Sequence, residues 1–201
     1  MENFQYILPE IFISVSIMLF LLVGVFKKNS AILIYNLSNI SLVILLALII
    51  NLSSLDTIYL FNESYLIDNL SNYMKIILVG SGIFVMLTGS KYIQVINLNK
   101  IEYPILILSS ILGMMIMISS NDLIVFYMGL ELQSLALYVL ASFNRDNLLS
   151  TESGLKYFVL SALSSGLLLY GCSLTYGFSE STNFDQILIN STEFNYGTTF
   201  G

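Results

Sequence analysis

The sequence lacks several residue types that carry common enzyme chemistry. Its 201 residues include no histidine, no tryptophan, two prolines and a single cysteine. One cysteine cannot form an internal disulfide, and without histidine the chain has neither a Cys/His zinc site nor an imidazole for acid–base catalysis. Charged residues make up only 10% of the chain, whereas soluble domains carry about 25%. Seven basic residues and a net charge of −6 also argue against a nucleic-acid partner.

Long apolar segments dominate what is present. Hydrophobic residues make up 56% of the chain, and the mean hydropathy is +0.84. A helix needs roughly 20 apolar residues to cross a bilayer. The sequence therefore predicts an all-α integral membrane protein, in which residues 1–178 form about six transmembrane helices and residues 179–201 form a polar tail. The predicted helices are Tyr6–Phe26, Ala31–Leu52, Tyr73–Ser90, Tyr103–Ile118, Leu123–Phe143 and Gly154–Tyr176.

Helices are favoured over strands by the membrane itself. An open sheet edge leaves backbone groups unpaired in lipid, and the ten-residue alternation of a membrane barrel is absent. Pro9 and Pro104 stand in first turns, where the missing N–H costs nothing. Asp122 and Thr151 stand at predicted N-cap positions.

The distribution of charge predicts the orientation of the chain. If the N-terminus is outside, the inner connections hold five basic residues: Lys27, Lys28, Lys91, Lys100 and Arg145. The same connections also hold three acidic residues: Glu102, Asp146 and Glu152. The outer segments hold only acidic residues: Glu2, Asp56, Glu63, Asp68, Asp122, Glu180, Asp185 and Glu193. Because basic residues concentrate in inner loops, both termini are expected on the outer side.

Four charges fall within the predicted helices: Glu10, Lys75, Glu131 and Lys156. An ionisable group at the centre of a membrane helix costs about 2.5–3.5 kcal/mol, so each is a candidate for function. Glu10 follows Pro9 in a first turn, where a solvated carboxylate beside the positive end of the helix dipole is the simpler interpretation. Lys75 lies near an outer helix end and is expected to extend to the interface.

Glu131 has the strongest case for a functional role. It lies nine residues after Asp122, which places it about 13 Å along the helix and near the bilayer midplane. Tyr127, Ser134 and Tyr138 stand at −4, +3 and +7, the spacing of one helical stripe, and are candidate relay groups. The alternative is a structural glutamate satisfied by a hydroxyl.

Lys156 is the second candidate. It lies two residues inside the start of the last predicted helix, so it could extend to the interface. The preceding helix should be its antiparallel neighbour, which makes Glu131 and Lys156 a plausible relay pair. Their offset along the membrane normal is about 10–15 Å, too long for a salt bridge. Carboxylate, amine and hydroxyl groups inside a low-dielectric bundle are suited to moving protons, and the sequence offers no metal or cofactor motif.

Several motifs resemble subunit 2 of respiratory complex I, the antiporter-like membrane subunit of proton-pumping NADH:ubiquinone oxidoreductase. The most specific are GLELQSL at 129–135 and STESGLKYF at 150–158. Shorter matches occur at 8–11 (LPEI), 119–123 (SSNDL), 160–171 and 184–187 (FDQI). The resemblance places the family's midplane glutamate on Glu131 and its lysine of the sixth helix on Lys156.

The resemblance also implies partners and cofactors. The expected partners are other membrane-arm subunits and lipids, while NADH, FMN, iron–sulfur clusters and ubiquinone are expected elsewhere in the complex, with no cofactor or metal on this chain. The sequence stops before the family's seventh helix, so a second polypeptide carrying the remaining helices is expected. A reduced, non-pumping assembly scaffold is the alternative, as is a subunit of a multisubunit cation/proton antiporter or membrane hydrogenase. The Ile- and Asn-rich composition without Trp and His favours a mitochondrial inner membrane, with a bacterial inner membrane as the alternative.

Overall fold

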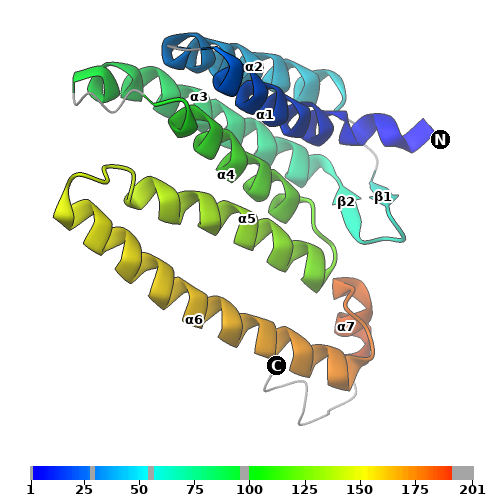
Figure 1. Ribbon diagram of the computed structural model, residues 1–201. Coiled ribbons are helices and arrows are strands. Elements are labelled where there is room, and N and C mark those ends of the chain that lie inside the picture. The colour runs from blue at the N-terminus through cyan, green and yellow to red at the C-terminus, as the bar shows by residue number, and fades with distance from the viewer. Residues whose placement is uncertain (1, 28–29, 54–56, 96–99, 192–201) are drawn as a thin grey trace.

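The computed structural model describes residues 2–27, 30–53, 57–95 and 100–191. Within them, six long helices run back and forth and account for most of the chain (Figure 1). A short 3₁₀ helix, η1 (Glu2–Ile7), precedes them. The long helices are α1 (Leu8–Phe26), α2 (Ala31–Asn51), α3 (Asn69–Val95), α4 (Glu102–Ile118), α5 (Leu123–Ala141) and α6 (Leu148–Ser179).

Their length and composition confirm the prediction of a helical membrane protein. Five of the described helices are long and apolar enough to cross a membrane, and α4 is apolar but has only 17 residues. Pro9 lies in the first turn of α1 as predicted. Asp122 caps α5, because its carboxylate accepts a hydrogen bond from the amide of Ile124 at 2.8 Å.

The predicted start of the sixth helix is wrong. α6 begins at Leu148, where the side chain of Asn147 accepts a hydrogen bond from the amide of Leu149 at 3.0 Å. Thr151, the predicted N-cap, lies inside the helix and donates its hydroxyl to the carbonyl of Leu148 at 2.9 Å. A search for continuous apolar runs misses this start because the polar residues Ser150–Ser153 interrupt the run, although an asparagine cap stabilises the first turn. The extra length places Lys156 further from the helix start than expected.

A β-hairpin between α2 and α3 was not predicted. Strands β1 (Ile58–Leu60) and β2 (Tyr65–Ile67) pair antiparallel around a turn with positive φ angles at 61, 62 and 63. The amide of Leu66 donates to the carbonyl of Ser119, and the amide of Asn121 donates to the carbonyl of Ser64. The hairpin belongs to a connection between membrane helices. Residues 119–121, which connect α4 to α5, therefore supply hydrogen-bond partners to backbone groups at its edge.

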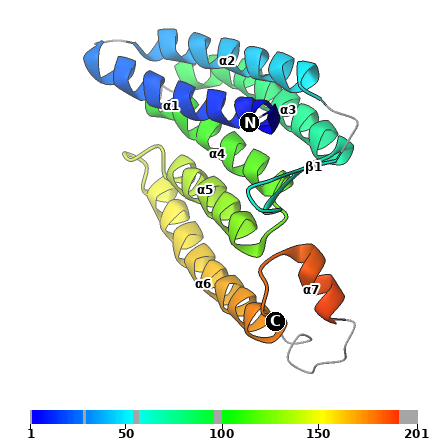
Figure 2. The same ribbon diagram turned by 90° about the vertical axis from the view of Figure 1, so that its right-hand side faces the viewer.

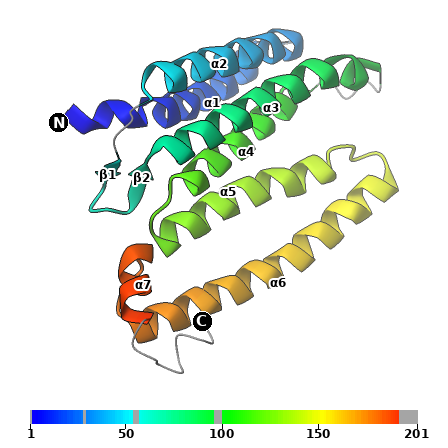
Figure 3. The same ribbon diagram turned by 180° about the vertical axis from the view of Figure 1, so that it is seen from behind.

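The segment predicted as a polar tail contains a further helix, α7 (Phe184–Ser191). It lies at the same end of the helices as the hairpin and the start of α5 (Figures 1 and 3). There Thr182 donates to Asp122 at 2.5 Å, and Asn121 donates to Asp185 at 3.0 Å. We call this the hairpin end; it comprises the hairpin, residues 119–122 and residues 180–185.

The apolar core lies among the first four long helices. Ile13, Leu42, Val79, Leu108 and Met115 are almost fully buried there. α5 packs against α4, whereas α6 lies at the edge of the molecule against α5 and α7 (Figure 2). The large apolar side chains of α6 are mostly exposed. This leaves a long apolar helix face without a protein neighbour in the described chain.

The described residues agree with the predicted segregation of charge. Lys27, Lys100 and Arg145 lie at the end opposite the hairpin, while Glu63 and Asp122 belong to the hairpin end. Lys28, Asp56 and Glu193 lie outside the described residues, as do the side chains of Glu2 and Lys91.

Candidate functional site

Glu131 lies in the interior of α5, eight residues after its start. At 1.5 Å per residue this is about 12 Å from the helix end. Its Oε1 atom is buried and has no hydrogen-bond partner among the described residues. A carboxylate oxygen so placed, inside a membrane helix, is costly unless a partner or a proton reaches it.

The three predicted relay residues have different surroundings. Tyr127 interacts electrostatically with Glu131 and with Ser165 of α6. Ser134 donates its hydroxyl to the backbone carbonyl of Glu131 at 3.1 Å, not to its carboxylate. Tyr138 donates to Ser161 of α6 at 2.6 Å. Tyr127 is therefore the residue of this stripe best placed to act on the Glu131 carboxylate.

Tyr138 holds α5 to α6 near the end opposite the hairpin. Its ring makes edge-on contacts with Tyr157 and Phe158, with centroid separations of 4.9 and 5.7 Å. Close by, a Cβ on Gly154 would lie 2.4 Å from the Cβ of Ser142. These contacts confirm that the two helices are antiparallel neighbours.

Lys156 has a partner that was not predicted. Its ammonium lies 2.6 Å from Glu152 Oε1 on the same helix, and the two side chains are 67% and 46% exposed. In the described chain, Lys156 makes no ion pair with Glu131. The two predicted site residues are thus on neighbouring helices without direct contact.

The position of Glu131 depends on a close approach of α4 and α5. A Cβ on Gly129 would lie 2.9 Å from the carbonyl oxygen of Gly113 and 2.9 Å from the amide of Met117. A Cβ on Gly113 would lie 2.6 Å from the amide of Gln133. Only glycine permits backbones at this distance, so these two residues fix the depth and rotation of the helix that carries Glu131.

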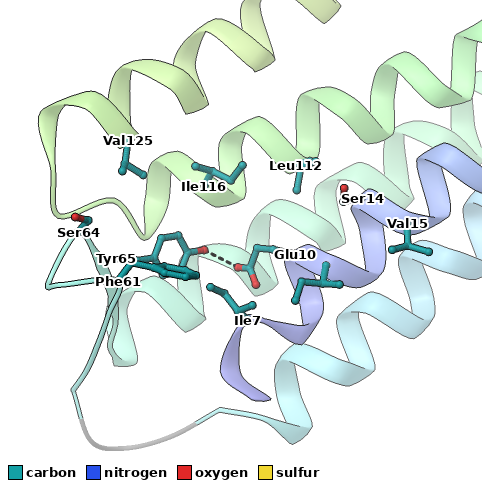
Figure 4. A pocket seen from close by; sticks show the side chains of 11 residues that line it. Ile7, Glu10, Ser14, Val15, Phe61, Ser64, Tyr65, Leu112, Ile116 and Val125 are labelled. Atoms are coloured by element: carbon teal, nitrogen blue, oxygen red, sulfur yellow. Dashed lines mark hydrogen bonds between the residues drawn. The ribbon is translucent and has the colours of Figure 1, made fainter. Parts of the chain in front are cut away.

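A second charged cluster lies at the hairpin end, and both predictions for its members are wrong. Glu10 is 7% exposed and Lys75 is 3% exposed, so neither is solvated nor extended to the interface. The Lys75 ammonium lies 2.6 Å from Glu10 Oε1, and Tyr65 donates its hydroxyl to the same oxygen at 2.8 Å (Figure 4). The two charged side chains can be buried because they form an ion pair with each other.

The hairpin completes this cluster. The Lys75 ammonium lies 3.4 Å from the Tyr65 hydroxyl and 5.3 Å from the centre of its ring. Burial, and then the Glu10 carboxylate, raise the pKa of Tyr65, which therefore remains a protonated donor. The sequence held one usable signal: Glu10 and Lys75 are opposite charges at the same predicted end of two helices.

The described residues also bear on metal binding. Among them, no three His, Cys, Asp or Glu side chains are grouped so as to hold a metal ion.

Comparison with known proteins agrees with this arrangement. Residues 120–200 match a family model described as the NADH:quinone oxidoreductase/Mrp antiporter transmembrane family. The chain is 64% identical, over its whole length, to NADH-quinone oxidoreductase subunit N of Pelagibacter ubique, and covers 43% of that protein. It is 53% identical to subunit N of Maricaulis maris over 70% of the chain, covering 30% of that protein.

Solved structures show the same fold. A chain of respiratory complex I from Thermus thermophilus superposes with a TM-score of 0.73 at 21% identity, over 90% of this chain and 42% of the other. A chain of an archaeal membrane-bound sulfane sulfur reductase gives 0.79 at 18% identity, over 96% of this chain and 40% of the other. The fold is that of antiporter-like membrane subunits. The resemblance to complex I is confirmed in a coarser form, because the similar proteins are named subunit N rather than subunit 2.

The chain spans less than half the length of these relatives. The long apolar helices support a multi-pass membrane protein. The relatives are bacterial, so they do not support the expected mitochondrial location.

Proposed function

We propose that this chain forms part of a proton-translocating path in the membrane arm of a bacterial NADH:quinone oxidoreductase. Glu131 is the group that takes up and releases the proton, and Tyr127 is its nearest relay. Lys156, Ser134 and Tyr138 are secondary candidates. The chain itself carries out no redox chemistry, and NADH, FMN, iron–sulfur clusters and quinone are held by other subunits.

The observation that carries this proposal is the position of the Glu131 carboxylate. It lies inside a membrane helix, with one oxygen buried and unpartnered in the described chain. An ionisable side chain in the interior of a membrane helix is costly, which makes it a candidate for function, and its free oxygen can accept a hydrogen bond from a water molecule or a relay group. The similarity to NADH-quinone oxidoreductase subunits supports the same assignment.

We propose that the hairpin end faces the periplasm and the opposite end faces the cytoplasm of a bacterial inner membrane. Lys27, Lys100 and Arg145 then lie on the cytoplasmic side, as the preference of basic residues for inner loops requires. Cysteine labelling from either side of sealed vesicles, at a cysteine introduced at Glu63 and one at Arg145, tests this orientation. Labelling of the Glu63 position only from the cytoplasmic side would reject it.

We also propose that further membrane helices of the assembled complex pack against the exposed face of α6. Leu155, Leu160 and Leu163 of that face are 65–68% exposed, and no residue in the most apolar stretch of α6 is buried within the described chain. Co-purification of this chain with a membrane polypeptide, reduced by Leu163→Glu, would support the arrangement.

The test of function is Glu131→Gln in the assembled complex. It keeps the shape of the side chain and removes its proton exchange. We expect proton pumping per NADH oxidised to fall by about tenfold or more, a conservative figure beside the roughly 10²–10⁴-fold that a positioned proton-transfer group contributes. Glu102→Gln, at an exposed position in the first turn of α4, is the matched control and should pump normally. Unchanged pumping in Glu131→Gln would reject the proposal.

A cation/proton antiporter subunit is the second candidate. Its support is structural: a chain of the Mrp complex from Dietzia superposes with a TM-score of 0.71 at 16% identity. Inhibitor-sensitive NADH oxidation by the purified complex containing this chain would favour the first function, and sodium/proton exchange without NADH oxidation the second. A complex that pumps normally without this chain would favour a scaffold.

A further inference from the structure

A pocket of about 640 Å³ lies beside the Glu10–Lys75 pair, between α1, the hairpin, α4 and the start of α5 (Figure 4). Its volume is within the range of pockets that bind small ligands. Its walls are mainly apolar and include Ile7, Leu112, Ile116 and Val125. Glu10 and the Tyr65 hydroxyl lie at one side, so the pocket joins a large apolar volume to one charged group.

The pocket opens on an exposed apolar face of α1. Ile11 and Val15 line it and are 47% and 50% exposed, although both belong to a membrane-spanning helix. An apolar space that opens sideways into a bilayer is accessible to the hydrocarbon chain of a lipid, which loses nothing by leaving its apolar neighbours.

The charged side of the pocket specifies the polar part of an occupant. Glu10 is more than nine-tenths buried, and its Oε1 already accepts from Lys75 and Tyr65. Its Oε2 is buried and has no hydrogen-bond partner in the described chain. An ionised carboxylate oxygen only accepts hydrogen bonds, so the occupant that satisfies it must carry an N–H or O–H donor.

The charge around the pocket favours an ammonium donor. Glu63 is adjacent to the lining residue Ser64, and Asp122 precedes the helix that carries Val125. Lys75 is the one basic side chain described at this end, and it is already paired with Glu10. The surrounding field therefore attracts a positive headgroup and opposes a net negative one.

We propose that this pocket binds phosphatidylethanolamine. One acyl chain fills the apolar part, and the headgroup ammonium donates a hydrogen bond to Glu10 Oε2. An anionic phosphatidylglycerol offers a similar acyl chain but brings net negative charge to an acidic surface. The site is independent of Glu131 and of proton translocation.

Native mass spectrometry of the full chain from nanodiscs with equal amounts of phosphatidylethanolamine and phosphatidylglycerol tests the proposal. We expect one phosphatidylethanolamine to remain bound per chain, with about tenfold preference, which corresponds to about 1.4 kcal/mol. Equal retention of the two lipids, or retention of neither, would overturn it. This comparison needs no variant, so it does not depend on how a substitution affects folding.

Variants then locate the lipid. Val125→Trp fills the pocket and should lower occupancy about tenfold, whereas Val43→Trp, on an exposed α2 position outside the pocket, should not. The double variant Glu10→Gln/Lys75→Gln removes both charges together and should abolish the preference for phosphatidylethanolamine while a lipid still binds. Unchanged occupancy in Val125→Trp, or a polypeptide of the assembled complex occupying the pocket, would reject the proposal.

Discussion

The Lys75 ammonium lies 2.6 Å from Glu10 Oε1, although the two residues are 65 positions apart in the sequence. The pair joins α1 to α3 at the hairpin end, and both side chains are almost fully buried. Tyr65, in the hairpin, donates its hydroxyl to the same oxygen, so the cluster connects the hairpin to α1 and α3 as well. A buried ion pair of this kind holds elements in one register, because neither charge is tolerated there without the other.

Breaking the pair should be far more costly than replacing it. Glu10→Gln leaves the buried Lys75 ammonium without a counter-charge, and we expect a loss of about 3–5 kcal/mol in the free energy of unfolding. The double variant Glu10→Leu/Lys75→Met replaces both charges by apolar groups and should recover most of that loss. Unfolding in detergent, followed by far-ultraviolet circular dichroism, measures both. Additive losses in the double variant would contradict the ion pair.

Tyr65 should make stability depend on pH in the alkaline range. Burial and the Glu10 carboxylate raise the pKa of Tyr65 above its ordinary value of 10. Because the folded-state pKa is raised, the contribution to stability is complete below the unfolded pKa and is lost as pH rises through the folded value. The wild type should therefore lose stability progressively above about pH 10.

Tyr65→Phe should flatten that part of the profile, because it removes the titrating group. At neutral pH it also removes a hydrogen bond to a charged acceptor, with an expected loss of about 1.5–3 kcal/mol. Tyr59→Phe, at an exposed position on the neighbouring strand, is the control and should retain the wild-type profile. Denaturant unfolding between pH 7 and about pH 11 gives the comparison. Parallel profiles for wild type and Tyr65→Phe would exclude this role.

Gly129 should be intolerant of any side chain. Its Cβ would meet the backbone of α4 at 2.9 Å, so Gly129→Ala must separate two helices and should cost about 1–3 kcal/mol. In α3, a Cβ on Gly80 would meet nothing within 4 Å, and Gly80→Ala should be neutral or stabilising. Thermal unfolding of both variants in the same detergent measures the difference. Equal stabilities would show that α4 and α5 are not held by this contact.

These glycines illustrate what the sequence could predict and what it could not. Ala162 and Gly166 stand four residues apart on α6, a spacing of small residues that is typical of closely packed membrane helices, yet a Cβ on Gly166 would meet nothing within 4 Å. A spacing pattern identifies a flat helix face but not its partner. The observed close approach uses single glycines on two helices, and a pattern within one helix cannot reveal it.

The same distinction separates the correct predictions for the site from the missed ones. The helices, the Asp122 cap and the interior position of Glu131 follow from local hydropathy and spacing, which the fold preserves. The Glu10–Lys75 pair joins distant segments, and the hairpin that completes it depends on hydrogen bonds to residues 119–121. Such contacts are set by tertiary packing, which local sequence patterns do not contain.

Lys156 offers a test that separates proton transfer from structure. Its ion pair with Glu152 is exposed and follows i,i+4 spacing, so it should contribute only about 0.3–0.5 kcal/mol to stability. Lys156→Gln and Glu152→Gln remove the same pair and should unfold almost alike. If Lys156 transfers protons, only Lys156→Gln should lower pumping per NADH oxidised in the assembled complex, by about tenfold or more. Equal pumping in the two variants would remove Lys156 from the proposed path and leave Glu131 as its one charged member in the described part of this chain.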